Sequence, residues 1–287
     1  MAARFDNARP RGGTIIVLKD ESLTIDQRTA TFNKAFPSDH YSQGEQIALR
    51  HMSLYYSWDN VTNAFGNTTG LSYRWVDGAV YDVTFPEGYY EVANMAEYLH
   101  FVTRENGHYL LDANGGEVYY LDFVVNPVYY RVTLTSTPVP SALPQDWSNP
   151  GGIPLNGLAP QLIVGPTNWG KLVGFAEGEY PATQGSVRVQ LNGSAAPAIE
   201  PVTSIHLLCD WVNDNRFSVN PSIIASFSPT VPFGTLISWS PPTLDFYDVT
   251  PRNYGGIQLR LVDQDYRPLM IKDYSAVQFT IMLRAAE

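Results

Sequence analysis

The sequence GEQIALRHMSLYYSWDNVT (residues 44–62) decides the fold, because it holds two alternating apolar patterns that are out of phase. Ile47 and Leu49 occupy odd positions, whereas the apolar residues from Met52 to Trp58 occupy even ones. Successive side chains of a strand point to opposite faces of a sheet, so this change moves the apolar set to the other face unless an extra residue is absorbed. We therefore predict a bend at Arg50–His51, where one long strand leaves a packed sheet and enters another, with the even positions facing the space between the sheets.

Alternation of apolar and polar residues recurs along the chain and predicts further half-buried strands. In VYYRVTL (residues 128–134), the apolar face is expected to hold Val128, Tyr130, Val132 and Leu134. The same pattern appears at residues 81–85, 187–191, 205–211, 257–261 and 277–283. The sequence is thus typical of an all-β protein.

One segment has helical spacing instead. In NMAEYLHFVTRENG (residues 94–107), Met95, Leu99 and Val102 recur every three or four residues. Asn94 and Glu97 resemble a capping box, and Gly107 stands where a left-handed residue ends a helix. We predict a short helix over about residues 95–105, in a connection between strands.

The stretch from residue 138 to residue 166 contains seven prolines and little periodicity. Proline removes hydrogen-bond donors from a β-ladder, so this stretch is predicted to be a long surface loop. A linker between two domains is the alternative. Because the apolar strands on either side look alike, we expect one domain over residues 14–287, preceded by an arm at residues 1–13.

Composition indicates a globular chain with a sizeable core. Of 287 residues, 44% are hydrophobic and 16% are charged, and no apolar run reaches the length needed to cross a bilayer. The N-terminus MAARFDNARPRGG lacks the apolar region of a signal peptide, so we expect synthesis in a cytosol-like compartment. Cys209 is the only cysteine, which excludes an internal disulfide and favours a place in the core.

Charge is uneven along the chain. The net charge of −10 argues against a general nucleic-acid binder, whose phosphate contacts need a basic surface. Arg4, Arg9 and Arg11 nevertheless make the first eleven residues cationic. This segment is either a solvated tail or an arm that contacts a neighbouring subunit, a nucleic acid or an anionic membrane.

Signals for catalysis or metal binding are weak. The chain has no GxGxxG, GxxxxGK[ST], HExxH or GxSxG motif, and its five histidines show no metal-ligand spacing. Asp263 and Asp265 could offer carboxylates to Ca²⁺, but a tight turn between strands is a sufficient local reason for both, and we prefer that interpretation. We therefore assign no catalytic residue, cofactor or metal.

Four tryptophans fall near turns or proline-rich loops: Trp75, Trp147, Trp169 and Trp239. Exposed tryptophans stack on sugar rings or anchor protein interfaces. The alternative is that they pack into the core and hold the loops in place.

The order of segments resembles the penton (minor capsid) proteins of virophages and Polinton-like viruses. The resemblance is carried by FNKAFPSDHYSQGEQIALRHMSLYYSWDNV, FPEGYYEVANMAEYLHFV, KLVGF, SIHLLCDWV, GGIQLRLVDQDYRPL and AVQFTIMLR, which together span nearly the whole chain. These are patterns of apolar residues and turns, and they contain no catalytic signature.

The resemblance implies a single jelly roll, in which two four-stranded antiparallel sheets pack face to face. It also implies a homopentamer at the fivefold vertices of an icosahedral shell, surrounded by double-jelly-roll major capsid proteins, and hence a place in the virion. About eight alternating strands agree with a jelly roll. The basic arm would then meet other minor capsid proteins or the genome, and the outer loops a host receptor.

Two other functions stay open. The first is a carbohydrate-binding or receptor-binding β-sandwich that uses the loop tryptophans. The second is an enzyme acting on polysaccharides, built on the same sandwich.

Overall fold

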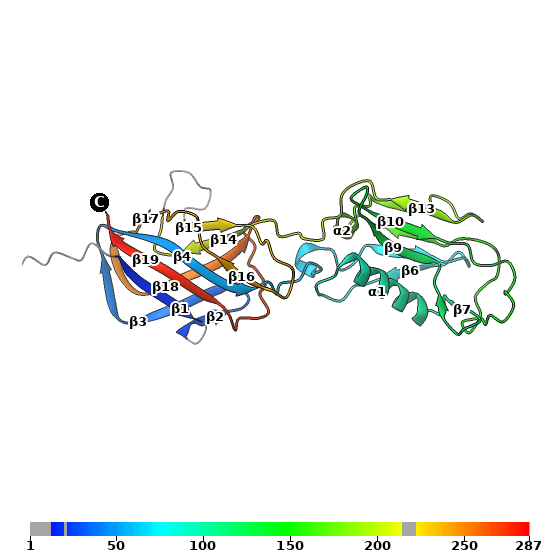
Figure 1. Ribbon diagram of the computed structural model, residues 1–287, viewed down its shortest axis with the longest axis horizontal. Helices are drawn as coiled ribbons and strands as arrows, with labels where there is room; N and C mark the ends of the chain where they lie inside the picture. Colours follow the sequence, from blue (N-terminus) through cyan, green and yellow to red (C-terminus); the bar gives the residue numbers. More distant parts are fainter. Residues whose placement is uncertain (1–12, 20–21, 214–221, 287) are drawn as a thin grey trace, which may run out of the picture. The chain divides into compact units, whose positions relative to one another are not determined.

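The computed structural model describes residues 13–19, 22–213 and 222–286. The chain forms two compact units (Figure 1). Unit 1 combines the residues up to Trp58 with those from Val202 onward, and unit 2 is the intervening segment Asp59–Pro201. This division differs from the single domain expected over residues 14–287. Unit 1 is separate from unit 2 because its strands come from the two ends of the chain and pair with each other. Local alternation of apolar and polar residues does not indicate which strands pair.

Unit 1 consists of two antiparallel sheets. Sheet A has the order β1-β19-β4-β16, with β17 also paired to β4, and sheet B has the order β15-β14-β18-β3-β2. The strands are β1 (Thr14–Lys19), β2 (Thr24–Asp26), β3 (Thr31–Ser42), β4 (Glu45–Tyr55), β14 (Ile205–Cys209), β15 (Ile223–Phe227), β16 (Leu236–Trp239), β17 (Tyr247–Asp248), β18 (Arg252–Asp263) and β19 (Gln278–Ala285).

Eight of these strands have jelly-roll topology. Taken in chain order without the short β2 and β17, the first pairs with the eighth, the second with the seventh, the third with the sixth and the fourth with the fifth. Further pairings of β4 with β19 and of β14 with β18 complete two four-stranded sheets. The predicted jelly roll of two four-stranded antiparallel sheets is therefore confirmed. Unit 2 is inserted between its third and fourth strands, β4 and β14.

Strand β4 absorbs its change of phase in a β-bulge. In its pairing with β19, Thr280 lies opposite His51 and Ile281 lies opposite Leu49, so the exposed Arg50 has no partner. The predicted irregularity is confirmed, but the predicted move to another sheet is wrong, because β4 pairs with β19 on both sides of the bulge. The extra residue restores the phase, so the apolar residues before and after it face the same core.

The core of unit 1 lies between the two sheets. Phe32 on β3 and Phe279 on β19 are fully buried and pack edge to face at a centroid distance of 5.2 Å. Met52 and Leu54 on β4 are also fully buried. Burial of such side chains contributes about 1.5–3 kcal/mol each, which fixes which face of β4 points inward.

Unit 2 contains smaller sheets and the only helix of more than two turns in the described residues. Its sheets have the orders β12-β11-β5-β6, β13-β10-β9 and β7-β8. The strands are β5 (Leu71–Arg74), β6 (Val80–Val83), β7 (Leu110–Leu111), β8 (Glu117–Val118), β9 (Leu121–Asn126), β10 (Arg131–Ser136), β11 (Gln161–Val164), β12 (Gly178–Tyr180) and β13 (Val189–Asn192), and the helices are η2 (Asn63–Phe65), α1 (Val92–Glu105) and α2 (Trp169–Val173).

Helix α1 confirms the predicted helix but begins earlier. The capping box is formed by Glu91 and Asn94, whose Oδ1 accepts a hydrogen bond from the Glu91 N–H at 3.1 Å. Met95 and Leu99 are fully buried, as the helical spacing requires. Gly107 follows the helix with a φ of 74°, in the left-handed conformation predicted for it.

The proline-rich stretch at residues 138–166 is only partly a surface loop. It includes strand β11, and Val139 and Leu162 are fully buried. Pro160 and Pro166 stand outside β11, so no proline interrupts its ladder. The prediction of an external loop is wrong for this strand. Strand β11 has four residues, and the surrounding prolines dominate the local composition, so the sequence pattern does not reveal it.

Candidate interaction surfaces

The predicted site residues fall into two groups. Arg4, Arg9 and Arg11 lie outside the residues that the structure describes. The four tryptophans are described, and none is an exposed loop residue. In Trp75 and Trp169 the exposed fraction is 1% and 0%, whereas Trp147 and Trp239 are half-buried.

Each tryptophan has packing partners that explain its burial. Trp169 lies within 5.8 Å of Phe85 and 6.0 Å of Phe123 between ring centroids, in the core of unit 2. Trp147 packs against the same core, and Trp239 stacks on Phe227 at 5.1 Å. The prediction of exposed aromatic loops is therefore wrong for Trp75 and Trp169. Local sequence marks the turns but not the elements that cover them.

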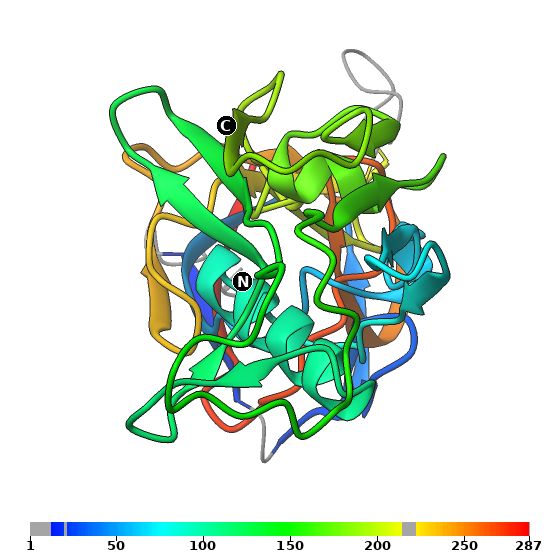
Figure 2. The same ribbon diagram turned by 90° about the vertical axis from the view of Figure 1, so that its right-hand side faces the viewer.

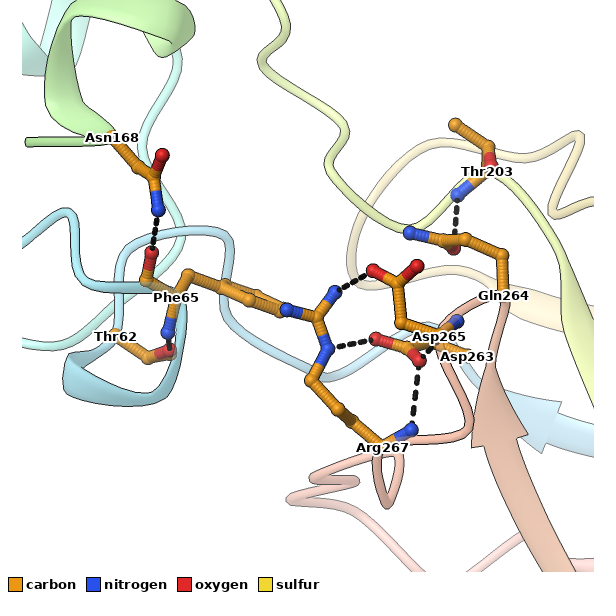
Figure 3. Close-up of polar contacts among 8 residues, drawn as sticks. All are labelled: Thr62, Phe65, Asn168, Thr203, Asp263, Gln264, Asp265 and Arg267. Carbon is orange, nitrogen blue, oxygen red and sulfur yellow. Dashed lines mark hydrogen bonds and ion pairs between the residues drawn. The ribbon is translucent and has the colours of Figure 1, made fainter.

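The acidic pair Asp263 and Asp265 lies in a structural turn. Asp263 Oδ1 accepts hydrogen bonds from the backbone N–H groups of Asp265 and Arg267, and its Oδ2 accepts one from Arg267 Nε at 2.8 Å (Figure 3). Arg267 Nη2 also donates to Asp265 at 2.6 Å. Both carboxylate oxygens of Asp263 accept hydrogen bonds from residues of the same turn, which supports the turn interpretation over the Ca²⁺ one. Within the described residues, no group of three or more His, Cys, Asp or Glu side chains could hold a metal ion.

Figure 3 also draws a capped turn in unit 2. Thr62 Oγ1 accepts a hydrogen bond from the Phe65 N–H at 3.1 Å, which caps η2, and Asn168 Nδ2 donates to the Phe65 carbonyl at 2.8 Å. These bonds tie the start of unit 2 to the segment before α2. They are structural contacts.

An open depression of about 430 Å³ lies beside the irregular pairing of β18 with β3. Tyr254 pairs with His40 and Gly256 with Ala35, so residues 36–39 loop out of the ladder. Arg252 lies 3.7 Å from the Asp210 carboxylate and 4.6 Å from the centre of the Tyr254 ring. Burial raises the pKa of Asp210. The charge of Arg252 opposes this shift, and its guanidinium forms an ion pair with the Asp210 carboxylate, so both charged groups beside the depression have a partner.

Apolar side chains are exposed on both edge strands of sheet A. On β1, Ile15 and Val17 are 48% and 47% exposed. On β16, at the other edge, Leu236 is 44% exposed, and Phe233 and Leu244 close to it in the chain are 37% and 38% exposed. Two apolar edges on one sheet are unusual for an unassociated sandwich, because edge strands are normally protected by charge, proline or cover.

A third apolar surface is the turn of the β9–β10 hairpin, the green pair of arrows at the upper left of Figure 2. Val128, Tyr129 and Tyr130 are 84%, 64% and 72% exposed. The prediction that Val128 and Tyr130 lie on a buried strand face is wrong, because β10 begins only at Arg131. Val132 and Leu134, in the same alternating run, are fully buried as predicted.

Sequence reasoning missed the edges of sheet A. The continuous apolar run in TIIVLK (residues 14–19) indicates a strand with two apolar faces, but its position at an edge depends on pairing with β19, more than 250 residues away in sequence. The chain offers no local marker for that position. The apolar turn was visible as a run of four uncharged residues after Asn126, which alternation alone misassigned.

Comparisons with known proteins bear on the fold. The sequence matches no protein-family model and no curated protein. The crystal structure of the mavirus penton protein matches this chain with a TM-score of 0.51 and 9% sequence identity, over 96% of this chain and 99% of that one. A chain of the Sputnik virophage structure determined by cryo-EM matches with a TM-score of 0.41 and 10% identity, over 96% of this chain and 98% of that one.

The strand topology defines a jelly-roll protein with an inserted second unit. The particular fold is that of the mavirus penton protein, which confirms at the level of the fold the resemblance to virophage penton proteins. In the described part of the chain, no helix is both long and apolar enough to cross a membrane.

Proposed function

We propose that this chain is a structural capsid protein of a virus, a penton subunit that forms pentamers at the fivefold vertices of an icosahedral shell. The observation that carries the proposal is the match to the mavirus penton protein, which extends over 96% of this chain and 99% of that one. The match therefore includes residues of both the jelly roll and the inserted unit. Such a role works through shape and self-association and requires no catalytic residue or cofactor.

The proposed setting is the virion. The pentamer would be surrounded by double-jelly-roll major capsid proteins, after synthesis in the host cytoplasm. A ring of identical subunits needs a heterologous interface, in which two different patches meet until the rotation closes. A stable contact of this kind buries about 800 Å² per partner. The apolar edges of sheet A support this requirement, because they supply two different patches.

The proposal is tested by the native mass of the purified chain, measured by light scattering over a wide range of concentrations. A mass of five chains is expected. Cryo-EM of particles assembled with the major capsid protein provides the second measurement, with density for this chain expected at the fivefold positions. A monomer at every concentration together with fivefold positions lacking this chain would overturn the proposal.

The basic arm is proposed to contact other capsid components or the genome. Its three arginines, Arg4, Arg9 and Arg11, give the first eleven residues a charge opposite to that of the chain as a whole. Deletion of residues 1–13 is expected to lower genome retention in assembled particles. Unchanged assembly and retention would lead us to abandon this part of the proposal.

A second candidate function is contact with a host receptor or glycan. The exposed turn of the β9–β10 hairpin favours it, because tyrosines are enriched where proteins bind partners. The buried Trp75 and Trp169 give it no support. A glycan and cell-binding screen comparing the natural chain with a Tyr129→Ser variant tests this function. Binding that the substitution abolishes would support it, and absence of binding by the natural chain would count against it.

A further inference from the structure

Strand β1 forms one edge of sheet A. Among the described residues it pairs with β19 alone. Leu18 is buried opposite Phe279, so its neighbours Val17 and Lys19 point to the outer face of the sheet. Ile15 lies on that outer face as well. The edge thus carries two exposed branched apolar side chains next to a free side of the ladder.

Strand β16 forms the opposite edge of sheet A. It pairs with β4, where the buried Ile237 lies opposite the buried Leu54. Leu236 therefore points to the outer face, the same face as Ile15 and Val17. The two edges present their apolar side chains on one continuous surface of the sheet.

Both edges carry little of the usual protection. The sequences TIIVLK and LISW contain no carboxylate and no proline, and their one charged residue is Lys19, at the end of β1. The exposed Ile15, Val17 and Leu236 make the rest of each edge apolar. Edge strands with so little charge, proline or cover tend to pair with another chain.

Strand directions make the two edges complementary. β1 is antiparallel to β19, β19 to β4 and β4 to β16, so β1 and β16 run in opposite directions. Rotation about an axis along the strands leaves their directions unchanged. In a ring of that kind, β16 of one copy and β1 of the next would lie antiparallel, which is the geometry of an antiparallel ladder.

From these relationships we infer that β1 of one copy packs against β16 of the next, joining the sheets A of neighbouring copies edge to edge. The occupant of each edge is a second copy of this chain. Ile15 and Val17 would contact Leu236 on the outer face, as cross-strand neighbours do within one sheet. The inference rests on the proposed pentamer and names the surface that would close it.

The test joins the two edges covalently. A double variant with Val17→Cys and Leu236→Cys is treated with a short bismaleimide and separated under denaturing conditions. Cys209 is buried, so the natural chain provides an unreactive background. The matched control is Val17→Cys with Met270→Cys, because Met270 is 50% exposed in unit 1 but lies on neither strand. We expect a ladder of linked chains that ends at five for the first variant and none for the control.

The outcomes separate the inference from the proposed function. A native mass of five chains without a ladder from the Val17→Cys, Leu236→Cys variant would overturn the inference and leave the pentamer intact. A ladder that continues beyond five chains would support the edge contact and reject a five-membered ring. A ladder of equal strength from the control would also overturn the inference, since it would show nonspecific collision.

Charge exchange provides an independent measurement. Val17→Lys and Leu236→Glu are each expected to weaken association at least tenfold, and the chain that carries both is expected to recover most of it. Circular dichroism identifies any variant that fails to fold. Pentamers of unchanged stability in both single variants would overturn the inference.

Discussion

The imidazole ring of His108 stacks on the indole ring of Trp75, with centroids 4.3 Å apart and an angle of 9° between the planes. Its Nδ1 forms a hydrogen bond with the Tyr73 hydroxyl at 2.9 Å, and Asn106 Nδ2 donates to the same hydroxyl at 2.8 Å. Burial lowers the pKa of His108 to about 4. The folded protein therefore holds this histidine neutral inside unit 2.

This lowered pKa predicts a loss of stability in mild acid. The unfolded chain takes up the proton near pH 6.5, whereas the folded chain resists it until about pH 4, so the stabilisation is complete above pH 6.5 and declines as the pH falls to 4. The loss should reach about 3 kcal/mol. Urea unfolding of the natural chain and of His108→Gln at pH 7.5 and pH 4.5 measures it. An equal pH dependence in both chains would contradict the prediction.

Leu54 fixes the inward face of β4, and its side chain is fully buried. Leu54→Asp should prevent folding of unit 1, because an unpaired buried carboxylate is strongly unfavourable. The milder Leu54→Ala should lower the free energy of unfolding by about 2–5 kcal/mol. Thr24→Asp, at an exposed position of β2, is the control and should fold normally. A soluble, folded Leu54→Asp protein would show that the face is assigned wrongly.

Gly151 approaches Gly107 so closely that a side chain cannot be added. A Cβ atom at position 151 would lie 1.8 Å from the Gly107 carbonyl oxygen, a backbone atom that cannot rotate away. Gly151→Ala is expected to destabilise unit 2 by about 1–3 kcal/mol. Gly185→Ala, in the same unit, meets nothing within 4 Å and should leave the unfolding midpoint nearly unchanged. Equal midpoints for the two variants would contradict this close approach.

Cys209 should be unreactive in the folded chain. Its thiol is buried on β14, and burial raises its pKa to about 12, so almost none of it is present as the reactive thiolate at neutral pH. Labelling by a thiol reagent is expected to be slow in buffer and fast in denaturant. Fast labelling of the folded chain would show that unit 1 opens readily at β14, and the measurement also checks the background of the cross-linking experiment.

Much of the fold could be read from local pattern. Alternation located the strands that contain Leu207, Leu259 and Phe279, all fully buried, and helical spacing located α1. The change of phase in β4 was correctly predicted at Arg50, but the predicted move of the strand to another sheet was wrong. A bulge and a change of sheet produce the same local pattern, and only the partner strand distinguishes them.

The candidate surfaces were less predictable. Exposure of Val128 and burial of Trp75 both contradict what their local sequence indicates. Each depends on whether other segments cover the residue. The basic arm remains a prediction from composition alone.

By itself, the sequence determined that this protein is all-β, with a buried cysteine, one substantial helix and no recognisable catalytic motif, because periodicity and composition follow from neighbouring residues. Tertiary structure alone decided that the jelly roll is assembled from both ends of the chain around an inserted unit, and that β1 and β16 stand at its edges. The physical reason is that these properties arise from pairings between strands distant in sequence, as between Leu18 and Phe279, which no local pattern encodes.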